Sequence, residues 1–184
     1  KKQIVLKFMK KDHDLAQAYQ AIDRLHEAGL IYDAHIMTGV AGKGRGMENA
    51  EALAQFLNRT NPAHVVNFSM FLHKEVPLYQ DIRQGTFVPA DELETIREEY
   101  HLIERIAPEK VGANILYDGF HDFIHVRVRG HLPGDKEKML AKLNGIIQEY
   151  EGKEPVYSFV QGECPDLEYC DDGKAVWDMD RKTS

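Results

Sequence analysis

The sequence has no long apolar run, no excess of positive charge and very little cysteine. No apolar stretch approaches the roughly 20 residues of a membrane-spanning helix. The formal net charge is −7, and a broad nucleic-acid surface would need clustered positive charge. Two cysteines, Cys164 and Cys170, do not make a disulfide framework and favour a reducing cytoplasm. We therefore expect neither a membrane nor a nucleic acid as a partner.

Common catalytic and metal-binding patterns are also missing. No serine lies on a nucleophile elbow, and the spacing of Cys164 and Cys170 fits no standard zinc site. His121 and His125 could face one metal on a helix, but the apolar residues between them favour a strand. On a strand they would share a face about 13 Å apart, too far for one metal. We interpret both as solvated or hydrogen-bonded and expect no metal ligand or catalytic residue in the chain.

What the sequence does contain is an alternation of helical and strand-like segments over 184 residues, of which 43% are hydrophobic. Strands are expected at 30–38, 65–72 and 111–117, with helices between them and a last helix from 136 to 150. Crossovers of a dozen or more residues imply parallel strands and right-handed βαβ units. The predicted class is α/β, with too few strands to close a barrel.

The helix that begins at Asp91 is rich in acidic residues. Leu93, Ile96, Tyr100 and Ile103 recur at helical spacing and are expected to face the core. The charged residues are interpreted as its solvated side. They are Glu92, Glu94, Arg97, Glu98 and Glu99. Glu48, elsewhere in the chain, and these acidic residues are interpreted as surface charge rather than as paired catalytic carboxylates.

The segment 39–46 alternates glycine with small or basic residues, after a strand and before a helix. Free N–H groups there could hold an anion, but the pattern of a P-loop is absent. A solvated connection that binds nothing competes with this interpretation. On the next strand Asn67 and Ser69 share one face. They could satisfy each other in a core or line a cavity, and we favour the cavity.

Seven stretches together resemble the radical S-adenosylmethionine (radical SAM) superfamily, in its iron-sulfur oxidoreductase, coproporphyrinogen-oxidase-like branch. They are 5–11, 25–29, 35–42, 62–72, 77–79, 85–87 and 130–136. The resemblance covers about the first 150 residues, and it is carried by their succession. It implies a partial (βα)6 TIM-like barrel with S-adenosylmethionine and a [4Fe-4S] cluster at the carboxyl ends of its strands. The reduced cluster cleaves S-adenosylmethionine to a 5′-deoxyadenosyl radical, which abstracts hydrogen from a substrate.

The resemblance also implies which residues bind the cofactor. Segment 35–42 corresponds to the family's fifth strand and its adenine-contacting motif, with Gly39 at the motif's glycine and Gly42 where the family has a glutamate. Segment 65–72 corresponds to the sixth strand. The implied cofactor-binding residues are His35, Met37, Thr38, Gly39, Gly42, Asn67 and Ser69.

The family's Cys-x3-Cys-x2-Cys loop has no counterpart in the chain, and Cys164 and Cys170 cannot replace it. We therefore expect residues 1–152 to be the carboxyl-terminal half of such a barrel, and 153–184 to be an irregular acidic extension with a short strand at 156–160 and an anchor at Trp177. This half could not bind the cluster, because thiolates hold the iron. Its expected partners are S-adenosylmethionine, an unknown substrate, and either the missing amino-terminal half or a second copy at the exposed barrel edge.

Two alternatives remain open. One is a small doubly wound nucleotide-binding module whose loop 39–46 holds phosphate; a five-stranded sheet would favour it. The other is a non-catalytic interaction domain whose acidic tail after Gly152 recruits a partner.

Overall fold

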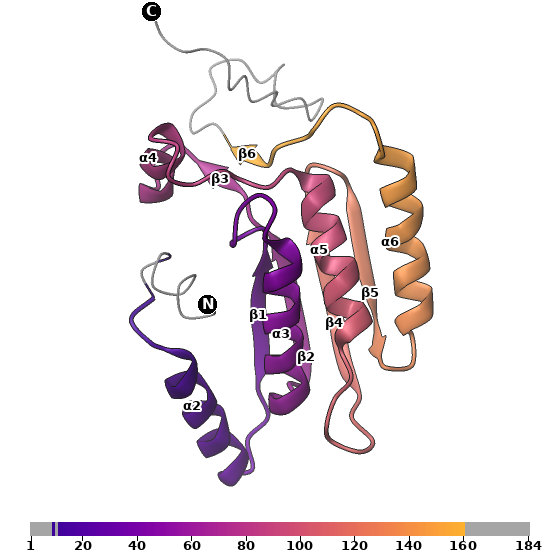
Figure 1. Cartoon of the computed structure of the whole chain (residues 1–184). Coiled ribbons are helices and arrows are strands. Elements are labelled where there is room, and N and C mark those ends of the chain that lie inside the picture. The colour runs from indigo at the N-terminus through magenta and orange to yellow at the C-terminus, as the bar shows by residue number, and fades with distance from the viewer. Residues whose placement is uncertain (1–8, 10, 161–184) are drawn as a thin grey trace, which may run out of the picture.

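The computed structural model describes residue 9 and residues 11–160, which form a mixed α/β structure (Figure 1). Its main sheet has four strands in the order β1–β2–β4–β5. Their bounds are Asp33–Thr38 (β1), His64–Ser69 (β2), Ile115–His121 (β4) and Val126–Leu132 (β5). β1, β2 and β4 are parallel, so their carboxyl ends meet at one edge of the sheet.

The fourth strand of the sheet departs from the parallel arrangement that the sequence led us to expect. β5 pairs with β4 in the antiparallel direction. Only residues 122–125 separate the two strands, and a link this short permits a hairpin but not a parallel crossover. The third predicted strand was also placed too early, because it begins at Ile115 rather than at 111.

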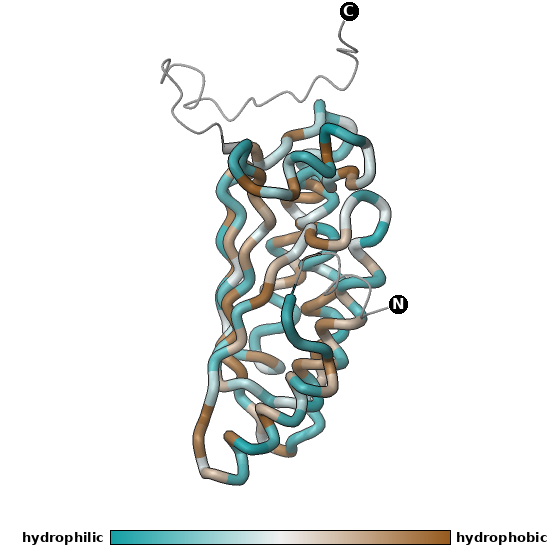
Figure 2. The backbone as a smooth tube through the Cα atoms, turned by 90° about the vertical axis from the view of Figure 1, so that its left-hand side faces the viewer, coloured by the Kyte–Doolittle hydropathy of each residue, from teal (hydrophilic) through white to brown (hydrophobic). Residues whose placement is uncertain are grey.

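The long helices cover one face of the sheet, as the edge-on view shows (Figure 2). They are α3 (Gly46–Thr60), α5 (Glu92–Arg105) and α6 (Lys136–Tyr150), while α2 (Leu15–Glu27) lies beside α3. The rings of Tyr19 and Phe56 join α2 to α3 at 5.2 Å. On β1 Ala34, Ile36 and Thr38 face these helices, and His35 and Met37 face the other way. In the described part of the chain no helix covers that other face.

Local signals in the sequence explain where the helices begin and end. Asp14 caps α2 in a capping box with Gln17, and Asp91 accepts a hydrogen bond from the Glu94 amide at the start of α5. Asn61 ends α3 in the left-handed conformation, directly before Pro62. The core between sheet and helices is apolar along most of its length. Its most deeply buried members are Ala50, Leu57, Val65, Ile96, Leu102, Ile103, Ile106, Ile115, Tyr117, Leu132 and Leu143.

A smaller unit lies beyond the carboxyl ends of the parallel strands. The two-residue strands β3 (Leu72–His73) and β6 (Phe159–Val160) pair there, next to the short helix α4 (Pro77–Arg83). Leu72, Ile82 and Phe159 form its buried cluster with Phe87. β6 covers only the last two residues of the segment 156–160, where a short strand was expected. Cys164, Cys170 and Trp177 lie outside the described residues. No helix within residues 11–160 is both long enough and apolar enough to cross a membrane.

Candidate functional site

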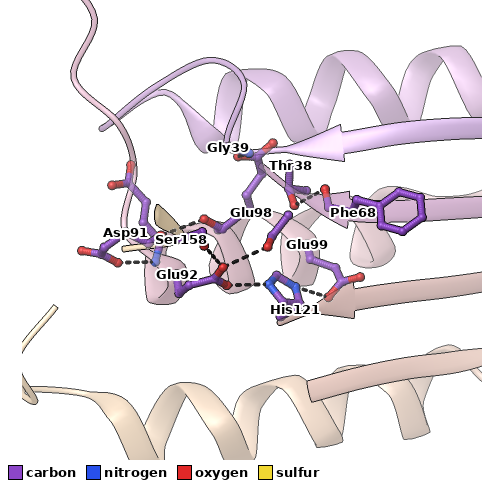
Figure 3. A network of polar contacts seen from close by, with 12 residues as sticks. Thr38, Gly39, Phe68, Asp91, Glu92, Glu98, Glu99, His121 and Ser158 are labelled. Carbon is purple, nitrogen blue, oxygen red and sulfur yellow. Dashed lines mark hydrogen bonds and ion pairs between the residues drawn. The ribbon is translucent and has the colours of Figure 1, made fainter. Parts of the chain in front are cut away.

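A set of polar side chains is buried between α5 and the carboxyl ends of the parallel strands. At its centre His121, the last residue of β4, lies between Glu92 and Glu99 of α5 (Figure 3). We call these three residues the α5 network. Their side chains are fully enclosed, with 0% exposure for all three. Charged groups are almost never found in such a place unless they are paired.

The imidazole of His121 contacts one carboxylate through each ring nitrogen. Nδ1 lies 3.0 Å from Glu92 Oε2, and Nε2 lies 2.9 Å from Glu99 Oε2. Burial alone would lower the pKa of His121, but the hydrogen bonds and negative charges of the two glutamates outweigh it and raise the pKa to about 9. At neutral pH the ring is therefore an imidazolium that donates both N–H groups.

The outer oxygens of the two glutamates are bonded as well. Glu99 Oε1 accepts from the Asn67 side-chain amide at 3.1 Å and from the Tyr117 hydroxyl at 2.9 Å. Glu92 Oε1 accepts from the Ser69 hydroxyl at 2.9 Å and from Ser158. Burial and the charge of Glu99 raise the pKa of Tyr117 well above its usual value, so the phenol stays protonated and donates. All four carboxylate oxygens of Glu92 and Glu99 are thus bonded, and these bonds connect α5 to β2, β4 and the chain before β6.

Space for Glu99 depends on a glycine in the neighbouring strand. A Cβ atom at Gly119 would lie 1.8 Å from Glu99 Oε1 and 3.1 Å from the ring of Tyr117. Glu99 could not move aside without losing its bonds to Asn67 and Tyr117. The absence of a side chain at Gly119 therefore lets the carboxylate approach the sheet.

A further carboxylate of α5 holds the glycine-rich loop. Glu98 Oε2 accepts from the Gly39 amide at 3.0 Å, and Glu98 Oε1 accepts from the Asn49 side chain at 2.6 Å. Glu94 accepts from the Gly44 amide. Burial raises the pKa of Glu98 to about 7. The hydrogen bonds from Asn49 and Gly39 act in the opposite direction, because they favour the charged carboxylate. The loop does bind anionic groups through its backbone, as its composition suggested, but they are carboxylates of the same chain.

These contacts correct our interpretation of the acidic helix. Glu92, Glu98 and Glu99 are 1%, 2% and 0% exposed, so they are not on the solvated side of α5. Helical spacing contained a signal for two of them, since Glu92 and Glu99 lie four residues before and three residues after Ile96, in phase with the core. Glu94 and Arg97 are only partly buried, closer to the expectation.

The two histidines of the β4–β5 hairpin have different surroundings. His121 is hydrogen-bonded, which confirms one of the two interpretations offered for it. His125 is exposed in the turn after β4, so the prediction that both lie on one strand face was wrong. Among the described residues there is no group of three or more histidine, cysteine or acidic side chains arranged to hold a metal ion.

The seven residues singled out as cofactor-binding lie on different sides of the sheet. Thr38, Asn67 and Ser69 are buried on the helix-covered side. His35 and Met37 are exposed on the other side. Among the seven, only Asn67 and Ser69 bond the α5 network directly.

The two glycines of the seven are needed for packing within the chain. Gly39 has φ +85° and donates its amide to Glu98. Gly42 has φ +80°, and a Cβ there would lie 2.8 Å from the carbonyl oxygen of Val88. Backbone conformation and close contact both account for glycine at these positions without a ligand.

A comparison of the chain with protein-family models, with curated proteins and with solved structures found no match.

Substitution of Gly119 by alanine tests the close approach of Glu99. We expect Gly119→Ala to lower the free energy of unfolding by about 1–3 kcal/mol or more, because the new methyl group displaces a buried, bonded carboxylate. Gly145→Ala is the matched control, since a Cβ there meets nothing within 4 Å on the exposed side of α6. It should raise stability by up to about 1 kcal/mol through helix propensity. Urea denaturation measures both, and equal effects would contradict the packing account.

The dependence of stability on pH tests the charge of His121. Its pKa is raised in the folded protein from 6.5 to about 9. Its contribution is therefore complete below about pH 6.5 and is lost as the pH rises through 9. The loss should be on the order of 3 kcal/mol. Denaturation between these limits should show the decrease in the wild type and in His125→Gln, and a flat profile in the wild type would contradict an imidazolium at this position.

Proposed function

We propose that the chain forms the carboxyl-terminal part of a radical SAM barrel, and that its parent is an iron-sulfur oxidoreductase acting on a substrate not yet known. The parent's cofactors would be S-adenosylmethionine and a [4Fe-4S] cluster, which together supply a 5′-deoxyadenosyl radical for hydrogen abstraction. The chain itself would contribute one wall of that barrel.

The observation that carries this proposal is the one-sided covering of the sheet. β1, β2 and β4 are parallel, and α3, α5 and α6 pack on one face only. In a (βα) barrel the helices form an outer ring, and the opposite face of the strands looks inward. The glycine-rich loop follows β1 at the carboxyl edge, where such barrels bind their ligands.

The uncovered face has side chains suited to contact with other groups. Met37 and Phe68 are 36% and 38% exposed on adjacent strands. The rings of Phe68 and Phe120 stack with their centroids 5.6 Å apart, and the Arg127 guanidinium lies 4.7 Å above the Phe120 ring. Arg127 also forms two hydrogen bonds with Asp118, at 2.8 and 2.6 Å. An inward face that is later lined by further strands and a ligand accounts for this exposed aromatic row better than a solvent-facing surface does.

The residues of the chain do not by themselves complete either cofactor site. Of the seven residues implied by the resemblance, only His35 and Met37 present side chains to the uncovered face, and the others are engaged in packing or in bonds within the chain. Cys164 and Cys170 cannot supply the three thiolates of a [4Fe-4S] site. The cluster ligands, and most of the contacts to S-adenosylmethionine, would therefore come from the preceding part of the parent.

The doubly wound nucleotide-binding alternative is disfavoured by two observations. Such folds carry helices on both faces of the sheet, whereas the described helices lie on one. The loop amides of Gly39 and Gly44 already bind carboxylates, so they are not free for phosphate. The interaction-domain alternative depends on residues 153–184, most of which lie outside the described part, and no observation favours it.

Anaerobic reconstitution with iron and sulfide tests the proposed function. We expect the parent to incorporate one [4Fe-4S] cluster per chain and to cleave S-adenosylmethionine reductively, releasing 5′-deoxyadenosine. Residues 1–184 alone should do neither, because they lack the three-cysteine loop. The matched control is the parent with the cysteines of that loop changed to alanine.

The assay reads iron, acid-labile sulfide and 5′-deoxyadenosine. Stoichiometric cluster in residues 1–184, or a parent that has no three-cysteine loop and no cleavage activity, would overturn the proposal.

A further inference from the structure

Both ends of the glycine-rich loop are fastened to α5. At its start the Gly39 amide donates to Glu98 at 3.0 Å. At its end Asn49, in the first turn of α3, donates to the other oxygen of the same carboxylate at 2.6 Å. One buried side chain thus bridges the end of β1 and the beginning of α3.

The packing around Glu98 leaves little freedom for another arrangement. A Cβ at Gly46 would lie 3.0 Å from Glu98 Oε2 and 3.1 Å from Glu98 Cβ, so the start of α3 rests directly on this glutamate. The side chain is 2% exposed, and no cation is paired with it in the described residues. The role of Glu98 therefore differs from that of Glu92 and Glu99, which neutralise His121.

We propose that Glu98 is a positioning residue that fixes the conformation of the loop from Gly39 to Asn49. The inference rests on the proposed function, since this loop contains the segment that resembles the cofactor-contacting motif. Glu98 would not touch the cofactor. It would hold the backbone that does.

Burial of Glu98 also makes the opening of this loop depend on pH, and the direction of that dependence follows from linkage. The pKa of Glu98 is raised from 4.5 to about 7, first by burial and also by the charge of Glu94, against the Asn49 and Gly39 hydrogen bonds and the charge of His121 on β4. When the loop opens, Glu98 meets water and regains its ordinary pKa. The closed loop therefore binds the proton more tightly than the open loop, and opening becomes easier as the pH rises from about 4.5 to about 7.

Amide hydrogen exchange of residues 1–184, corrected for intrinsic rates, tests the proposal. In the wild type the open population reported by the Gly39 and Gly44 amides should rise by up to about tenfold per pH unit between pH 5 and 7, and then level off. Glu98→Gln should exchange faster in this loop at pH 5, and its profile should be flat. Glu104→Gln, an exposed residue on the same helix, should keep the wild-type profile.

The amides of α6 separate a local effect from global unfolding. Exchange at Leu143, in the buried core, should not follow the pH profile of the loop. A wild-type loop without pH dependence, or a Glu98→Gln loop with the wild-type profile, would overturn the proposal. If Glu98→Gln does not fold, the proposal is tested by whether loop exchange in the wild type and in Glu104→Gln shows the expected pH dependence.

A second arm uses the parent and distinguishes failure of this inference from failure of the proposed function. Glu98→Gln in the parent should weaken the binding of S-adenosylmethionine by tenfold or so, with the cluster content unchanged, because a loosened loop must be ordered on binding. A wild-type parent that binds no S-adenosylmethionine would refute the proposed function but leave the exchange result standing. Unchanged affinity in the variant would refute only the positioning role.

Discussion

Three carboxylates are buried on α5, and the fold depends on the one cation placed between two of them, Glu92 and Glu99. Glu92 and Glu99 could not enter the core unpaired, because the effective cost of burying an isolated charge is several kcal/mol. His121 reaches both, and its position at the end of β4 fixes where α5 crosses the sheet. Asn67 and Tyr117 then hydrogen-bond the second oxygen of Glu99, and the absence of a side chain at Gly119 leaves room for this carboxylate.

This anchoring also determines where the glycine-rich loop lies. With α5 fixed on β4, Glu98, the residue before Glu99, points toward β1 and α3 and accepts a hydrogen bond from the Gly39 amide. Helix α5 therefore supplies the two glutamates that bind His121 and also the glutamate that holds the glycine-rich loop at the carboxyl edge of the sheet. Within the described residues no helix covers the face away from α5, and this face carries the row from Met37 to Arg127. A buried polar layer beside a face that no described helix covers supports the proposal that the chain is one wall of a larger barrel rather than a doubly wound domain.

Much of the framework could be predicted from hydrophobic periodicity, because β1, β2 and the helices bury regular apolar stripes. The antiparallel strand β5 was not predicted, because the helix–strand alternation favours parallel crossovers, whereas the four-residue link after β4 permits only a hairpin. The central site was missed for a different reason. Glutamates on a helix are usually solvated, and the partner of Glu92 lies 29 residues away in sequence, on another element. Asn67 and Ser69 were correctly placed on one face, but only the tertiary structure shows that this face meets two glutamates.

Nitrogen NMR of the His121 side chain tests the central claim most directly. The account predicts an imidazolium at about pH 8, with both ring nitrogens protonated and both N–H signals protected from exchange with water. An unperturbed histidine is almost entirely neutral at that pH. A neutral tautomer of His121 with one unprotonated nitrogen at pH 8 would contradict the account, because Glu92 and Glu99 would then share the core without a cation between them.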